Sequence, residues 1–170
     1  MIEKLFRKYK RNCHRFVETG THTGAGIQAA IDAGFSEACI VTFDVDEEKA
    51  ARARAKFPRA HIYAKSSPCE EFGCMALSRE PALFWLDAHY MGDGGTVGID
   101  YPLINEISVL SLSTTPHVIL CDDVRLFDRY GTSVKEIVGT MNKTQKYRHE
   151  FATSKPGLPN DVLVLIPEAE

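Results

Sequence analysis

The sequence predicts a doubly wound α/β domain: a mostly parallel, seven-stranded sheet with an antiparallel edge strand and helices on both faces. Two observations lead to this prediction. Apolar runs rich in β-branched and aromatic residues alternate with helical segments, and they lack the polar alternation of half-exposed strands. Four of these runs also end on a carboxylate, at Glu18, Asp44, Asp87 and the pair Asp122 and Asp123.

The expected elements follow each other in strand–helix alternation. Residues 1–12 are expected to form an N-terminal basic helix. Strands are expected over residues 14–19, 37–44, 59–64, 82–87, 117–121, 147–151 and 162–166. Helices are expected over residues 24–33, 47–56, 68–77, 102–112 and 132–141. The last two strands read as a pair across a Pro/Gly/Asn-rich turn, which predicts the antiparallel edge.

Several element ends carry recognisable signals. Gly34 is placed to close the first of the five later helices, and Asp46 is a good N-cap for the next one. Pro102 suits the first turn of a helix. Residues 90–100 contain four glycines and are expected to form a mobile loop.

Length and composition narrow the function classes. The 170 residues are expected to form one domain, residues 1–170, with a net charge of −3 that argues against nucleic-acid binding as the main role. No apolar stretch approaches the roughly 20 residues that span a bilayer, and the N-terminal residues lack a secretory signal. The five cysteines form no Cys-x-x-Cys pair and are expected to be reduced. We therefore expect a cytoplasmic protein with no membrane partner.

The acidic strand ends predict a ligand site. In an open parallel sheet, ligands bind outside the carboxyl ends of the strands, so these side chains should converge on one crevice. Neighbouring carboxylates repel each other and raise each other's pKa unless a partner compensates them. The expected ligand is therefore positively charged, hydroxylated or bridged by a metal.

A glycine-rich turn follows the first strand, with the sequence Glu18-Thr-Gly20-Thr21-His22-Thr-Gly24. Read as acid-x-Gly-x-x-x-Gly, it resembles motif I of class I S-adenosylmethionine-dependent methyltransferases, with His22 in place of the usual middle glycine. This resemblance implies a Rossmann-like fold and a cofactor site formed by Glu18 and the turn.

The resemblance continues along the chain, over about residues 14–166. Asp44 matches the acid that receives the ribose hydroxyls, and a carboxylate can accept two hydrogen bonds from a vicinal diol. Ser66 lies where such families often carry a Gly-Asp-Ser segment near the adenine, and Lys65 and Ser66 depart from that pattern. Asp87 completes the implied cofactor set.

The later acids resemble the metal site of macrocin-type O-methyltransferases, which methylate sugar hydroxyls. This resemblance implies that Asp87, Asp122 and Asp123 bind Mg²⁺ or Mn²⁺, the ions that hard oxygen ligands favour. His89 matches a position held by an acidic residue in that family, and imidazole can take up a proton at neutral pH. It is therefore the candidate catalytic base. The segments around Trp85 and Pro102 are also similar to small bacterial methyltransferase-like proteins of unassigned substrate.

The function implied by these resemblances is a metal-assisted O-methyltransferase that acts on a small-molecule hydroxyl, such as that of a sugar. One alternative is a non-catalytic cofactor-binding or regulatory module of the same fold. A nicotinamide-dependent oxidoreductase is a weaker one, because the chain lacks both Gly-x-Gly-x-x-Gly and Tyr-x-x-x-Lys. The capping of the next segment by Asp122 or Asp123 also stays open as a non-metal role. The acceptor pocket is open, covered by residues 90–100, or completed by a second subunit of a homodimer.

Overall fold

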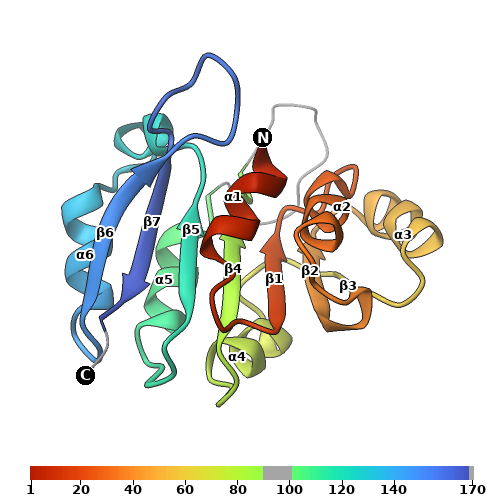
Figure 1. The fold of residues 1–170 in the computed structure, drawn as a ribbon, viewed down its shortest axis with the longest axis horizontal. Coiled ribbons are helices and arrows are strands. Elements are labelled where there is room, and N and C mark those ends of the chain that lie inside the picture. Colours follow the sequence, from red (N-terminus) through yellow and green to blue (C-terminus); the bar gives the residue numbers. More distant parts are fainter. Residues whose placement is uncertain (90–100, 169–170) are drawn as a thin grey trace.

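A computed structural model describes residues 1–89 and 101–168. Its core is a seven-stranded sheet in the order β3-β2-β1-β4-β5-β7-β6 (Figure 1). The strands are β1 (Arg15–Thr19), β2 (Ile40–Asp44), β3 (His61–Ala64), β4 (Ala82–Leu86), β5 (Val118–Cys121), β6 (Tyr147–Ala152) and β7 (Val162–Pro167). Strands β1 to β5 pair in parallel, and β7 pairs antiparallel with both β5 and β6. The predicted doubly wound sheet with an antiparallel edge is therefore confirmed.

Helices cover both faces of the sheet. They are α1 (Ile2–Tyr9), α2 (Ala25–Asp32), α3 (Glu47–Lys56), α4 (Glu70–Ala76), α5 (Leu103–Leu110) and α6 (Val134–Met141). The first three pack on one face in a cluster around Phe16 and Trp85, and the last three pack on the other around Phe84 and Ile119. Successive residues of a strand point to opposite faces, so Phe84 and Trp85 feed different clusters. Both faces are apolar because both are covered.

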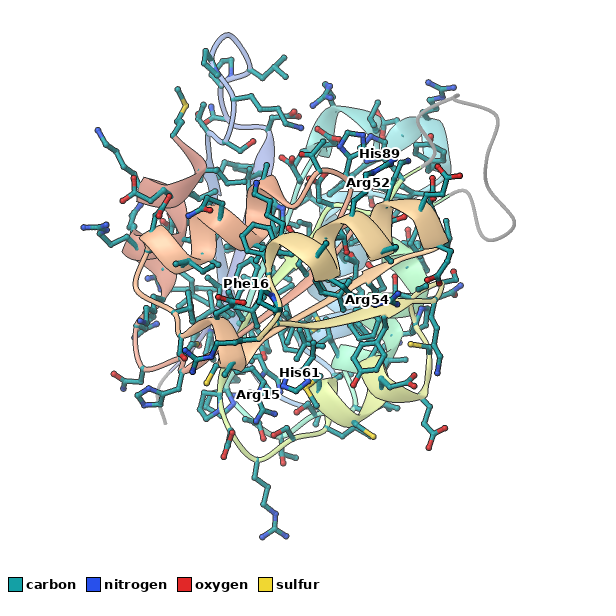
Figure 2. The ribbon with its side chains drawn as sticks, turned by 90° about the vertical axis from the view of Figure 1, so that its right-hand side faces the viewer. Arg15, Phe16, Arg52, Arg54, His61 and His89 are labelled. Carbon is teal, nitrogen blue, oxygen red and sulfur yellow. The ribbon has the colours of Figure 1, made fainter. Side chains whose placement is uncertain are left out.

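The carboxyl ends of the parallel strands lie at one edge of the sheet. Figure 2 shows His89, which follows β4, at the opposite edge from Arg15 and His61, which begin β1 and β3. The connection between β6 and β7 also projects from the carboxyl edge (Figure 1). The predicted convergence of strand ends therefore occurs at an edge to which the β6–β7 connection also contributes.

Some predicted boundaries are wrong. Residues Glu37–Cys39 form a 3-10 turn, η1, and the second strand begins only at Ile40. The turn is fixed by a hydrogen bond from Cys39 N to Ser36 O, and the Glu37 carboxylate accepts one from Arg59 N. Two further 3-10 turns after β5, η2 (Val124–Leu126) and η3 (Asp128–Tyr130), were not predicted.

Other predicted end signals are confirmed. Gly34 follows α2 with a φ of +93°, and the Asp46 side chain caps α3 by accepting from Glu48 N and Lys49 N. The loop predicted at residues 90–100 lies outside the described residues. Within the described ranges, no helix combines the length and the apolar character needed to cross a membrane.

Candidate functional site

A cleft of about 420 Å³ opens at the carboxyl edge of the sheet. Its lining contains every predicted cofactor residue except Gly24, together with the predicted base His89 and the predicted metal ligand Asp123. The predicted ligand Asp122 does not line it. Residues from β1, β2 and β4 and the residue Asp123, which follows β5, thus meet in one cleft, as the acidic strand ends indicated.

Glu18 provides a buried carboxyl at the end of β1. Its exposed fraction is 2%, and one carboxylate oxygen accepts a hydrogen bond from Thr42 Oγ1 at 2.8 Å. Burial raises the pKa of Glu18 to about 8, and the nearby charge of Asp44 adds to this effect. No cationic side chain of residues 1–89 or 101–168 pairs with Glu18.

Gly26 makes room for this carboxyl. A Cβ atom at position 26 would lie 1.7 Å from Glu18 Oε1, a distance that no side chain could tolerate. The first turn of α2 therefore packs directly against the acid. This constraint is the physical reason for a glycine at position 26 in the first turn of α2.

The glycine-rich turn approaches the neighbouring strand closely. At Gly20, a Cβ atom would lie 2.7 Å from the backbone oxygen of Asp87, and the φ of +87° also favours glycine. His22, which stands where the resembled motif has a glycine, takes a φ of +45°. Its backbone N–H donates to Asp44 Oδ2 at 2.7 Å, so the Asp44 carboxylate helps to hold the turn in this conformation.

Asp44 lies between the turn and the start of α3. Its second oxygen, Oδ1, accepts from Asp46 N at 2.9 Å. Asp46, not Asp44, caps the helix, and within the described residues each Asp44 oxygen accepts only one hydrogen bond, so Asp44 can accept further bonds in the cleft that it lines. Ser66 also lines the cleft, in the connection after β3.

The other half of the cleft brings together Asp87, His89 and Asp123. His89 Nδ1 lies 3.8 Å from Asp87 Oδ1 and 3.4 Å from Asp123 Oδ2. Both distances exceed a normal hydrogen bond, so the attraction is electrostatic. One atom from each of the three residues lies within 4.8 Å of the other two.

Asp122 faces a different group of residues. Its oxygens contact Ser154 Oγ at 3.0 Å and Lys155 Nζ at 2.9 Å, both from the β6–β7 connection. Lys155 Nζ also lies 3.0 Å from Asp123 Oδ1. Asp123 precedes η2 with a φ of +58° and makes no side-chain cap hydrogen bond, so capping does not explain its side chain.

Sequence reasoning did not find the two cations of this half. Lys155 pairs with Asp122 and Asp123, and Arg125 pairs with Asp123 at 2.5 Å and also with Asp161. Arg125 lies in an unpredicted 3-10 turn, and Lys155 and Asp161 lie in the connection between the last two strands. No local motif marks any of the three residues, because only the tertiary fold brings them to β5.

These contacts set the electrostatics of the half of the cleft that contains Asp87, His89 and Asp123. Although burial opposes it, hydrogen bonds from Arg125 and Lys155 hold the pKa of Asp123 below its usual range. Asp87 behaves in the opposite way, because burial and the charge of Asp122 raise its pKa well above the usual range.

The donor set fits a divalent cation. Within the described residues, three carboxylates, those of Asp122, Asp123 and Asp161, share two cations, Lys155 and Arg125, and Asp87 forms an ion pair with neither cation. Asp123 Oδ2 is buried without a hydrogen-bond partner and belongs to the triad of Asp87, His89 and Asp123. The carboxylate oxygens of Asp87 and Asp123 are ligands of the kind that suit Mg²⁺ or Mn²⁺.

No protein-family model matches the sequence, and no curated protein does either. Solved structures do match the fold. A methyltransferase from Geobacter sulfurreducens aligns with a TM-score of 0.62 and 13% identity, over 98% of this chain and 78% of that one. A Podospora anserina methyltransferase with bound S-adenosylhomocysteine gives 0.61 and 16%, over 99% and 76% of the two chains.

An O-methyltransferase from Bacillus cereus, in complex with S-adenosylhomocysteine, gives a TM-score of 0.59 and 16% identity, over 97% of this chain and 78% of that one. At such low identity these likenesses establish the architecture alone. The chain has the Rossmann-like fold of the class I S-adenosylmethionine-dependent methyltransferases.

Proposed function

We propose that the protein is an S-adenosylmethionine-dependent O-methyltransferase that acts, with the help of a divalent cation, on a hydroxyl of a small molecule such as a sugar. One observation carries the proposal more than any other. Glu18 is a buried carboxyl in the cleft, with a raised pKa and no cationic partner among the described residues. Because a buried carboxylate is costly without a counter-charge, the ligand should bring a positive group.

The cofactor side of the cleft then follows from the placement of its donors and acceptors. Glu18 accepts the ammonium group of S-adenosylmethionine, and Asp44 accepts the ribose hydroxyls. The Gly20 turn lets the ligand lie close to the backbone. S-adenosylmethionine carries both a sulfonium and an ammonium group, which suits this acidic surface.

The metal side prepares the acceptor. Asp87 and Asp123 would hold the divalent cation, and Lys155 and Arg125 pair with Asp123. When bound, the cation lowers the pKa of the acceptor hydroxyl and orients it. His89 has its Nδ1 toward the two carboxylates, which leaves Nε2 to take the hydroxyl proton as the new oxygen–methyl bond forms and the sulfur–methyl bond breaks.

The same observation separates this proposal from a nicotinamide-dependent oxidoreductase. A dinucleotide would place an anionic pyrophosphate beside the turn, next to Glu18 and Asp44. Those carboxylates would repel it. A non-catalytic module of the same fold would bind the methyl donor and would not need the Asp87, His89 and Asp123 triad.

Calorimetry over a range of pH tests the proposed cofactor site. A bound ammonium group favours ionised Glu18, so the affinity for S-adenosylhomocysteine is expected to rise between pH 6 and 8 and then to level off. In Glu18→Gln the rise should disappear, and the affinity at pH 8.5 should fall by roughly 10- to 150-fold, the range for a hydrogen bond to a charged group. NAD should bind to neither protein.

Glu70→Gln is the matched control, because Glu70 is an exposed acid of α4. It should leave both the affinity and the pH dependence unchanged. If the wild type binds S-adenosylhomocysteine with no pH dependence, or binds NAD more tightly, the proposed cofactor site is wrong.

A further inference from the structure

A second buried carboxyl, that of Glu106 in α5, lies near the cleft and has no role in the proposed reaction. Its exposed fraction is 1%, and it accepts a hydrogen bond from Ser67 Oγ. Burial raises its pKa to about 7, although the hydrogen bond from Ser67 acts in the opposite direction. Among residues 1–89 and 101–168, no cation forms an ion pair with Glu106.

The partner of Glu106 belongs to the cleft. Ser67 lies in the connection between β3 and α4, directly after Ser66, and both serines line the cleft. Glu106 therefore ties the wall of the cleft at the β3–α4 connection to helix α5.

The direction of the Ser67 hydrogen bond has a chemical consequence. A hydroxyl has one proton to donate and two lone pairs to accept with. Because the Ser67 proton is directed to Glu106, the oxygen can offer only lone pairs to another group. The cleft wall at Ser67 is therefore an acceptor surface, and it favours a ligand group that carries an N–H or O–H donor.

The order of the strands indicates which part of the ligand meets this wall. In the proposed complex, Glu18 of β1 receives the ammonium group and Asp44 of β2 receives the ribose. The base then lies beyond β2, toward the connection that follows β3. The purine edge of the ligand is thus the part that Ser66 and Ser67 can contact.

We propose that Glu106 is a specificity-determining residue, which fixes the Ser67 hydroxyl as an acceptor so that the cleft selects a purine with an exocyclic amino group over one with a carbonyl group. This inference rests on the proposed function, because it assumes a nucleoside ligand in the cleft. Glu106 acts through Ser67 and does not itself touch the ligand. A purely structural tie between α5 and the β3–α4 connection would stabilise the fold without discriminating between bases.

The experiment compares S-adenosylhomocysteine with S-inosylhomocysteine, in which a carbonyl oxygen replaces the amino group, by calorimetry. The wild type is expected to prefer the amino form by at least tenfold, because a carbonyl would face the Ser67 lone pairs. In Glu106→Met the Ser67 hydroxyl is free to rotate and donate, so the preference should fall below threefold. Ser67→Ala, which removes the acceptor, should do the same.

Ser108→Ala is the matched control. Ser108 lies on the same helix as Glu106, and its hydroxyl donates to Ile104 O on the exposed side. The Ser108→Ala variant should keep the full preference of the wild type for the amino form. Thermal melts of all variants confirm that each is folded, and Ser67→Ala keeps the test valid if Glu106→Met does not fold.

The outcomes separate the two proposals. Equal affinity of the wild type for the two nucleosides overturns the role of Glu106 but not the proposed function. A preference that survives in both Glu106→Met and Ser67→Ala also overturns it. If the wild type binds neither nucleoside, the proposed function is wrong, and this inference falls with it.

Discussion

The two halves of the cleft hold their carboxylates in different ways. On the β1–β2 side, the hydrogen bonds to Glu18 and Asp44 come from one hydroxyl and two backbone N–H groups. On the β4–β5 side, Asp122 and Asp123 are paired with Lys155 and Arg125. Neutral donors orient a carboxylate without cancelling its charge, whereas a lysine or arginine cancels part of it.

This difference assigns the halves to different tasks. Lys49 and Lys65 also line the cleft, where they pair with Asp46 and Glu71. Within the described residues, no cation forms an ion pair with Glu18 or Asp44, so these carboxylates can attract a positively charged ligand such as the proposed sulfonium cofactor. A half that is already partly neutralised holds its acids close together, and a small hard cation can share them. A substitution in one half should therefore leave ligand binding in the other half unchanged.

The largest expected effect concerns His89, the proposed catalytic base. His89→Gln should lower the turnover number by about 100-fold or more, because no side chain is left to take the proton from the hydroxyl of the methyl acceptor. Cofactor affinity should stay within a factor of two or three. Steady-state kinetics and Mn²⁺ titration followed by electron paramagnetic resonance measure these quantities. A tenfold loss of Mn²⁺ affinity would instead identify His89 as a metal ligand, and unchanged turnover would show that it is not the base.

The independence of the halves is tested by a pair of variants. Asp44→Ala removes the expected bonds to the ribose diol, which costs about 1.5–3 kcal/mol, or roughly 10- to 150-fold in cofactor affinity. Mn²⁺ affinity should not change. Asp87→Asn should give the reverse pattern, with weaker Mn²⁺ binding and near-normal binding of S-adenosylhomocysteine. If either variant weakens both ligands equally, the two halves form one coupled site.

Overpacking at α2 tests the packing behind the β1–β2 side of the cleft. Gly26→Ala places a Cβ atom on the Glu18 carboxyl, and the expected loss of unfolding free energy is about 1–3 kcal/mol. Gly73→Ala is the matched control, because nothing lies within 4 Å of a Cβ atom at that helical position. It should stabilise the protein by about 0.5–1 kcal/mol. Urea denaturation measures both, and equal effects would contradict the packing argument.

A smaller effect is expected when Lys155, which pairs with Asp122 and Asp123 on the β4–β5 side of the cleft, is replaced. Lys155→Met leaves Asp122 and Asp123 with less compensation, at a cost of about 1–2 kcal/mol because the lysine is 43% exposed and partly screened by solvent. The melting temperature should fall by a few degrees, and Mn²⁺ should restore part of the loss. Lys135→Met, at an exposed lysine of α6, should show neither effect. A melting temperature unchanged in Lys155→Met would remove Lys155 from the charge balance.

Much of the fold could be predicted because it depends on local patterns in the sequence. Buried strands read as continuous apolar runs, and Gly34 and Asp46 mark helix ends by their own chemistry. The acids Glu18, Asp44 and Asp87 end strands, so the parallel topology alone brings them to one edge. The start of β2 was placed too early, because the Arg59 contact that helps to fix the preceding turn comes from a distant residue.

The rest was decided by the tertiary structure. Lys155, Arg125 and Glu106 carry no local signal of a site, yet they set the charge and the hydrogen-bond direction of groups that the sequence did identify. Asp122 and Asp123 share Lys155, but Asp122 also contacts Ser154, whereas Asp123 lies beside Asp87 and His89, and this difference has the same origin. Sequence determines which residues end a strand, because that depends on near neighbours. The partners that those residues meet across the cleft depend on connections far along the chain, and only the folded arrangement defines them.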